Sequence, residues 1–155
     1  MWNKFVERAK PEASPEPHTA YVRRRRTVAV QPLEILVVDD EQSICMLLQD
    51  VLTRFGHRVH TRQDGAAGLQ LAREQSFDLA FLDIRMPGMG GLEALKQLRE
   101  IHPKATFVMI TGFAKDDIID EALQSGASAC LCKPFSLSQV TKLLEEVTSG
   151  APVTV

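Results

Sequence analysis

Four short apolar segments of this chain end in polar residues, and this recurrence limits the fold more than any other feature. Residues 35–38, 79–82, 108–110 and 129–132 are followed by Asp39 and Asp40, Asp83, Thr111, and Lys133, respectively. Near-continuous apolar runs are typical of parallel strands that are buried on both faces. Such strands end at a common edge of the sheet, where the binding sites of open α/β folds lie. The pattern therefore predicts one site, assembled from these polar residues.

Strand-like and helix-like segments alternate between residues 33 and 149. Apolar residues recur at helical spacing after each apolar run, and Gly56 and Gly126 stand where helices are expected to end. The expected strands are 33–38, 57–61, 79–82, 105–110 and 129–132, and the expected helices are 44–55, 65–74, 92–101, 116–125 and 137–147. Five repeats of strand and helix predict an α/β fold, a doubly wound five-stranded parallel sheet with helices on both faces.

Length and composition fit one domain with a tail at each end. The 155 residues are 45% hydrophobic and 25% charged, which excludes a wholly disordered chain and suits a soluble globular protein. No apolar run approaches the ~20 residues that span a bilayer, and no secretory signal opens the chain. Three sparse cysteines argue against a disulfide framework and favour a cytoplasmic location. We expect a tail at residues 1–32, a domain at 33–149 and a short C-terminal tail at 150–155.

The N-terminal tail is basic and contains four prolines, a composition that predicts disorder. It holds seven Lys or Arg residues and three Glu residues, whereas the whole chain has a net charge of −2, so the domain is acidic. The block Arg23–Arg26 suits contact with nucleic acid or anionic lipid, or is a solvated charge run. Trp2 and Phe5 share one helical face, as in a short docking helix or a frayed end.

The residues at the strand ends are those that phosphoryl chemistry requires. Asp39, Asp40 and Asp83 would repel one another unless a cation lay between them, and Mg²⁺ prefers such oxygen ligands. Lys133 supplies a positive charge and Thr111 a hydroxyl donor, so the set suits a phosphoryl group held by electrostatics and position. Asp83 is the best nucleophile among them, since carboxylates form acyl phosphates. No general base stands beside it, so slow turnover is expected.

The chain resembles the receiver domains of two-component response regulators. The resemblance rests on four motifs, Val37–Glu41, Asp83–Met89, Ile110–Gly112 and Lys133–Phe135. Each motif alone is weak, but their joint order and spacing are specific, and they span residues 33–149. The resemblance implies a flavodoxin-like sheet with strand order 2-1-3-4-5.

The resemblance also implies a role for each site residue. Asp83 matches the phosphoacceptor, which takes a phosphoryl group from a histidine kinase or a phosphotransfer protein. Thr111 matches the hydroxyl that moves onto the phosphoryl oxygen, and Lys133 matches the lysine that pairs with it. The Mg²⁺ ligands implied are Asp39 (partly through water), Asp40, Asp83 and the backbone carbonyl of Arg85.

Two positions of this chain depart from the family pattern, and one peptide bond can be checked against it. Cys130 stands where the family usually has an aromatic residue whose rotamer reports phosphorylation, so the usual Thr–aromatic switch is in question, with Phe113 and Phe135 as possible contributors. Gly90 stands where relatives often have an acid, which softens the loop. The Lys133–Pro134 bond is often cis in the family. The three cysteines suit small hydrophobes better than metal or redox roles.

The function that the sequence favours is a phosphorylation-dependent signalling switch rather than an enzyme. We expect a stand-alone receiver that signals by partner binding or phosphorelay, with an unidentified protein partner on the face formed by residues 116–149. We expect no DNA-binding domain and no membrane span in this chain. The alternatives are the receiver portion of a longer regulator, and a non-phosphorylated adaptor that acts through its basic tail. An aspartyl-phosphate phosphatase is disfavoured, because Arg85 stands where a second Asp would act as acid and base.

Overall fold

The computed structural model describes residues 31–113 and 115–154. The predicted N-terminal tail lies outside the described residues apart from Gln31 and Pro32, as does Val155 at the other end. The strands are β1 (Glu34–Val38), β2 (Arg58–Arg62), β3 (Leu79–Asp83), β4 (Thr106–Thr111) and β5 (Ala129–Cys132). The helices are α1 (Gln42–Arg54), α2 (Gly65–Glu74), α3 (Gly91–Ile101), α4 (Asp116–Gln124) and α5 (Leu137–Ser149).

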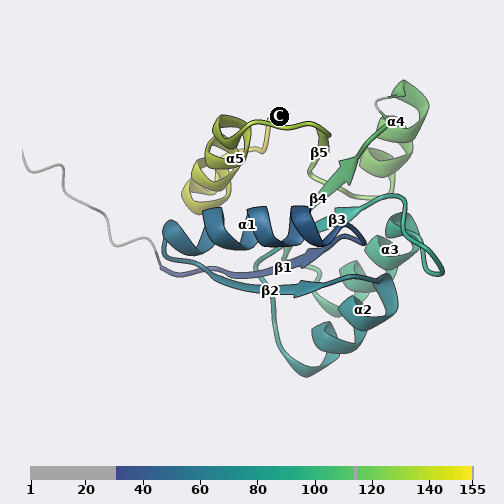
Figure 1. The fold of residues 1–155 in the computed structure, drawn as a ribbon, viewed down its shortest axis with the longest axis horizontal. Helices are drawn as coiled ribbons and strands as arrows, with labels where there is room; N and C mark the ends of the chain where they lie inside the picture. Colours follow the sequence, from purple (N-terminus) through teal and green to yellow (C-terminus); the bar gives the residue numbers. More distant parts are fainter. Residues whose placement is uncertain (1–30, 114, 155) are drawn as a thin grey trace, which may run out of the picture.

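The five strands form one parallel sheet in the order β2-β1-β3-β4-β5. Helices cover both faces, with α1 and α5 on one side and α2 and α3 on the other (Figure 1). This arrangement confirms the doubly wound α/β fold and the strand order 2-1-3-4-5. Within the described part of the chain, no helix has both the length and the apolar character needed to cross a membrane.

The inner strands β1, β3 and β4 each contribute to two separate cores, because successive side chains point to opposite faces of a sheet. In β1, Ile35 and Val37 pack under α1 and α5, whereas Leu36 and Val38 pack under α2 and α3. All four are completely buried. Burial on both sides explains why the strands read as apolar runs rather than as alternating patterns.

The start of β2 differs from the prediction by one residue. His57 was expected to open this strand, but the strand begins at Arg58. The ring of His57 is buried and its Nδ1 accepts a hydrogen bond from the backbone N–H of Leu33, 3.2 Å away. Burial disfavours the imidazolium and lowers the pKa of His57. The side chain therefore ties the entry to β1 to the turn after α1 instead of joining the sheet.

Helix α5 begins with a capping box, in which Ser136 is the N-cap. The Ser136 hydroxyl accepts a hydrogen bond from the backbone N–H of Gln139, and the Gln139 side chain accepts one from the backbone N–H of Ser136. We expect Ser136→Ala to lower the free energy of unfolding by ~1 kcal/mol, because the backbone N–H of Gln139 loses its side-chain acceptor. Urea unfolding measures this loss. Ser136→Asp, which keeps an acceptor, should retain most of the stability, and equal losses in both variants would contradict the capping role.

Candidate functional site

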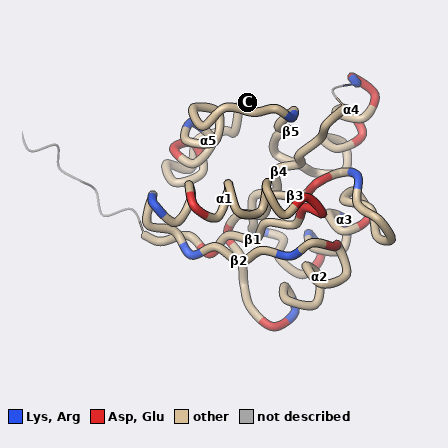
Figure 2. The backbone as a smooth tube through the Cα atoms, viewed as in Figure 1, with Lys and Arg blue, Asp and Glu red and all other residues tan. Residues whose placement is uncertain are grey.

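Three carboxylates meet at the carboxyl ends of β1 and β3. One oxygen from each of Asp39, Asp40 and Asp83 lies within 4.8 Å of the other two. Asp39 is completely buried and Asp83 nearly so, whereas Asp40 is exposed. Figure 2 shows the acidic residues crowded beside the end of β3. The predicted acidic cluster is therefore present, with its two inner members shielded from water.

Lys133 reaches into this cluster from the end of β5. Its Nζ lies 2.9 Å from Asp39 Oδ2, 3.4 Å from Asp83 Oδ1 and 2.7 Å from Glu41 Oε1. The backbone N–H of Lys133 donates to the carbonyl of Thr111, 2.7 Å away, which fixes the lysine beside the end of β4. The Lys133–Pro134 peptide is cis, as the resemblance implied. Glu41 is a partner of the lysine that the sequence reasoning did not identify.

Burial and mutual repulsion control the protonation of these groups. Burial, reinforced by the neighbouring Asp39 charge, raises the pKa of Asp83 to about 6. Burial also raises the pKa of Asp39 above its ordinary value, although the Lys133 ammonium opposes this shift. Burial favours the neutral amine of Lys133, but its contacts with Glu41 and Asp39 outweigh burial and raise the pKa of this lysine. The site therefore holds more negative charge than its single ammonium neutralises.

The donor set suits a hard divalent cation. Asp39 Oδ2 is buried and has no hydrogen-bond donor among the described residues, because the Lys133 ammonium contacts it outside hydrogen-bonding geometry. A buried acceptor without a donor is costly unless another positive group approaches it. Three clustered carboxylate oxygens, one of them on an exposed residue, match the ligands that such cations prefer.

Thr111 ends β4, the strand beside β3, but its hydroxyl is engaged elsewhere. The Thr111 Oγ1 donates to the carbonyl of Phe113, 3.1 Å away, and accepts from the Phe113 N–H at 3.0 Å. The ring of Phe113 in turn lies 4.1 Å from the Arg85 guanidinium carbon, in cation–π contact. Thr111, Phe113 and Arg85 are thus linked in series along the mouth of the site. The sequence motifs named these residues but did not predict the linkage.

The loop after Asp83 approaches its own strand so closely that one position requires glycine. A Cβ on Gly91 would lie 1.9 Å from the backbone oxygen of Asp83. The backbone N–H of Gly91 donates to the carbonyl of Ile84 at 3.0 Å, and Ile84 N–H donates to Ile110 at 2.8 Å. These contacts hold the start of α3 against the end of β3. Because the loop folds back onto the end of β3 directly after Asp83, this residue stays at the carboxyl end of the strand, beside the other acids.

The cysteines lie outside this cluster of charges. All three are free, and burial raises the pKa of Cys130 to about 11, so its thiol is neutral. Cys45 is buried beneath the end of β1, where its Sγ lies 3.3 Å from the carbonyl of Asp39. These environments agree with the prediction that the cysteines pack as small hydrophobes.

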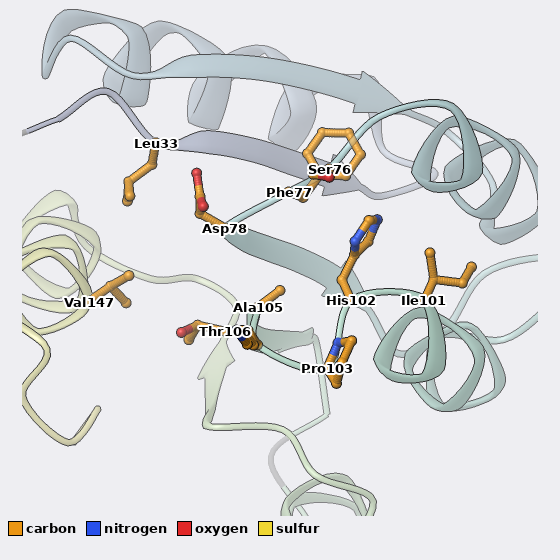
Figure 3. Close-up of a pocket in the computed structure, with 11 residues that line it drawn as sticks. Leu33, Ser76, Phe77, Asp78, Ile101, His102, Pro103, Ala105, Thr106 and Val147 are labelled. Atoms are coloured by element: carbon orange, nitrogen blue, oxygen red, sulfur yellow. The ribbon is translucent and has the colours of Figure 1, made fainter.

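A cavity of about 510 Å³ lies at the opposite edge of the sheet, at the amino ends of β1, β3 and β4 (Figure 3). Two of its polar side chains already have backbone partners. Asp78 accepts the N–H of Glu34 at 2.8 Å, and His102 Nε2 lies 2.8 Å from the carbonyl of Ala72. The cavity contains none of the clustered carboxylates, so the acidic end of the sheet is the candidate site.

The family model of the response regulator receiver domain matches residues 35–145. The chain belongs to this family. The transcriptional regulatory protein ZraR of Klebsiella oxytoca is 37% identical over 129 residues, which are 80% of this chain but only 29% of that relative. The receiver domain therefore corresponds to less than a third of this curated relative.

Solved structures show the same likeness. Chemotaxis protein CheY4 of Vibrio cholerae superposes with a TM-score of 0.71 at 30% identity, covering 75% of this chain and 98% of that one. A response regulator from Burkholderia pseudomallei was solved with a phosphorylated aspartic acid and a calcium ion. It superposes with a TM-score of 0.69 at 25% identity, and the match covers 76% of this chain and 69% of that one. The receiver domain described above thus shares its fold with a protein in which an aspartic acid is phosphorylated.

Proposed function

We propose that this receiver domain is a phosphorylation-dependent signalling switch whose phosphoacceptor is Asp83. The observation that supports the proposal most strongly is the position of this carboxylate, at a strand end beside two other acids and 3.4 Å from the Lys133 ammonium. A pKa of about 6 leaves Asp83 largely ionised near neutral pH, as a nucleophile must be. The phosphorylated aspartic acid of the Burkholderia pseudomallei relative lends further support.

The reaction we propose is a direct transfer. An Asp83 carboxylate oxygen forms a bond to phosphorus as the phosphorus–nitrogen bond of a phosphohistidine breaks, and the imidazole leaves with a proton from solvent. The donor is the histidine of a kinase or phosphotransfer protein. Hydrolysis of the acyl phosphate is slow in this proposal, because the described carboxylates beside Asp83 are the ones assigned to the cation and are therefore not available as a general base for the attacking water.

Asp39, Asp40 and Asp83, with the backbone carbonyl of Arg85, are the residues we assign to Mg²⁺. The buried Asp39 oxygen, which lacks a hydrogen-bond donor among the described residues, and the excess of carboxylates over the one Lys133 ammonium support this assignment. When bound, the ion supplies positive charge to the phosphoryl oxygens. Lys133 holds a further phosphoryl oxygen by charge, and its anchored backbone fixes where that charge lies.

Thr111 is the proposed sensor of the phosphoryl group. To donate to a phosphoryl oxygen, its hydroxyl must give up the hydrogen bonds that it makes with the backbone of Phe113. That exchange alters the loop before α4 and the stacking of Phe113 on Arg85. A change that spreads from Thr111 through Phe113 offers a response that does not require an aromatic residue at Cys130.

The output we propose is binding of a downstream protein to the face formed by residues 116–149, or onward phosphotransfer. The receiver would act in the cytoplasm, which its three free cysteines favour. The match to ZraR over 29% of that protein favours one second candidate, the receiver portion of a longer regulator. A third, an adaptor that acts through the basic residues 1–32, has no described structure to support it.

Intact-mass measurement after incubation with acetyl phosphate and Mg²⁺ tests the proposal. We expect the mass of one phosphoryl group to be gained, and the gain to be absent when Mg²⁺ is chelated. Asp83→Asn should gain nothing, whereas Asp120→Asn, which removes an exposed carboxylate of α4 instead, should react like the unaltered chain. Incorporation into Asp83→Asn, or none into the unaltered chain with phosphohistidine donors as well, would refute the assignment.

A further inference from the structure

A groove of about 410 Å³ runs between α4, β5 and α5, on the flank of the domain away from the carboxylates. Cys130 and Cys132 line it from β5, and both side chains are only partly buried. Leu123 of α4 borders it and is 44% exposed. The remaining border includes Val153 and Thr154, which follow α5 in the chain. The chain after α5 therefore forms part of the wall of the groove rather than pointing away from the domain.

The turn that returns the chain is specified by its sequence. Gly150 ends α5 in the left-handed region, with φ of 69°, a conformation that glycine adopts without strain. The N–H of Gly150 donates to the carbonyl of Val147 and that of Ala151 to Glu146, which closes the helix end. Pro152 cannot continue a helix. The segment that follows runs back beside α5 toward β5 (Figure 1).

Three hydrogen bonds and one apolar contact hold the segment there. The backbone N–H and the hydroxyl of Thr154 donate to the two carboxylate oxygens of Glu146, at 2.8 and 2.7 Å. The Lys142 ammonium donates to the carbonyl of Thr154 at 2.7 Å. Val153 packs against the core under α1 and α5. These contacts use the backbone and hydroxyl groups of Thr154 and the partly buried side chain of Val153, so they define a specific docked position.

We propose that residues 151–154 form an intramolecular strap that covers the groove between α4, β5 and α5, and that a protein partner must displace the strap to enter the groove. The proposal concerns the unphosphorylated chain and does not depend on whether Asp83 accepts a phosphoryl group. A strap of four residues is displaceable, because its few surface hydrogen bonds are opposed by the conformational entropy of ordering it. A partner therefore binds in the groove only if its binding free energy exceeds the free energy that displacing the strap costs.

The two groove thiols report whether the strap is in place. We expect Glu146→Gln and Val153→Asp to increase the rate at which N-ethylmaleimide modifies Cys132 and Cys130 several-fold, as followed by mass spectrometry of peptides. Glu145→Gln is the matched control, because Glu145 is exposed and its side chain makes no hydrogen bond or ion pair with described residues. Its rates should equal those of the unaltered chain.

Cys45 separates release of the strap from loosening of the domain. This thiol lies on the buried face of α1 and is not among the residues that line the groove. The deciding quantity is the ratio of the Cys132 rate to the Cys45 rate. A ratio that rises in both strap variants supports the proposal, whereas a ratio that stays at the value of the unaltered chain in both overturns it.

Discussion

In metal-free buffer near pH 8, replacing Asp83 with Asn is expected to raise the free energy of unfolding by about 2–3 kcal/mol, since each pKa unit corresponds to about 1.4 kcal/mol. The pKa of Asp83 rises from 3.8 to about 6 on folding, so the folded state disfavours the carboxylate. Between these values the folded state binds more protons than the unfolded state, and stability falls as pH rises through this window. Above pH 6 the full penalty is present. Asparagine keeps the shape of the side chain without the charge.

Urea unfolding at several pH values measures this effect. The difference between Asp83→Asn and the unaltered chain should shrink toward zero as the pH is lowered to about 4, where the folded-state carboxyl is protonated. Mg²⁺ near neutral pH should stabilise the unaltered chain and have a much smaller effect on Asp83→Asn. Asp120→Asn serves as the exposed control, and its stability should change little. Equal stability of Asp83→Asn and the unaltered chain at pH 8 would show that the cluster carries no such penalty.

The sequence predicts the sheet and the acidic cluster because both follow from one-dimensional patterns. Burial on both faces forces apolar runs such as Leu79–Leu82, and the alternation with helical spacing specifies parallel strands. Once the strands are parallel, their ends lie at one edge, and the strand order that the resemblance implied places β1 beside β3, so Asp39 and Asp83 must be near one another. Two strands lie between β1 and β5, at whose end Lys133 stands, and the long side chain of this lysine spans that distance.

The finer arrangement depends on contacts that have no local signature. Lys133 pairs with Glu41, which is 92 residues away, because the ends of β1 and β5 both face the site. The Thr111 hydroxyl points toward Phe113 rather than toward Asp83. The free energies of the two rotamers differ by about as much as one hydrogen bond contributes. His57 leaves the expected strand for a similar reason, since its ring is held by Leu33. Such choices depend on the surrounding tertiary structure.

Lys133→Met should have the opposite effect to Asp83→Asn and lower the free energy of unfolding by about 3 kcal/mol near neutral pH, because it removes one partner of a buried ion pair. The ammonium contacts the completely buried Asp39 at 2.9 Å and is itself only slightly exposed. Methionine fills the stem of the side chain but leaves the carboxylates without their only cation among the described residues. The raised pKa of Lys133 means that its ammonium persists at every pH below about 10, so on the acid side the stabilisation is lost only where the carboxylates take up protons.

Two conditions should reduce the loss, and both follow from the charge of the cluster. Lowering the pH lets Asp39 or Asp83, whose pKa values are already raised by burial, take up a proton in place of the missing ammonium. Saturating Mg²⁺ replaces the lost positive charge directly. Lys96→Met, a control on the exposed face of α3, should change stability by less than about 0.5 kcal/mol. If Lys133→Met lost as much stability with Mg²⁺ as without it, at every pH, the lysine would act through packing rather than through its charge. The electrostatic account of the site would then be wrong.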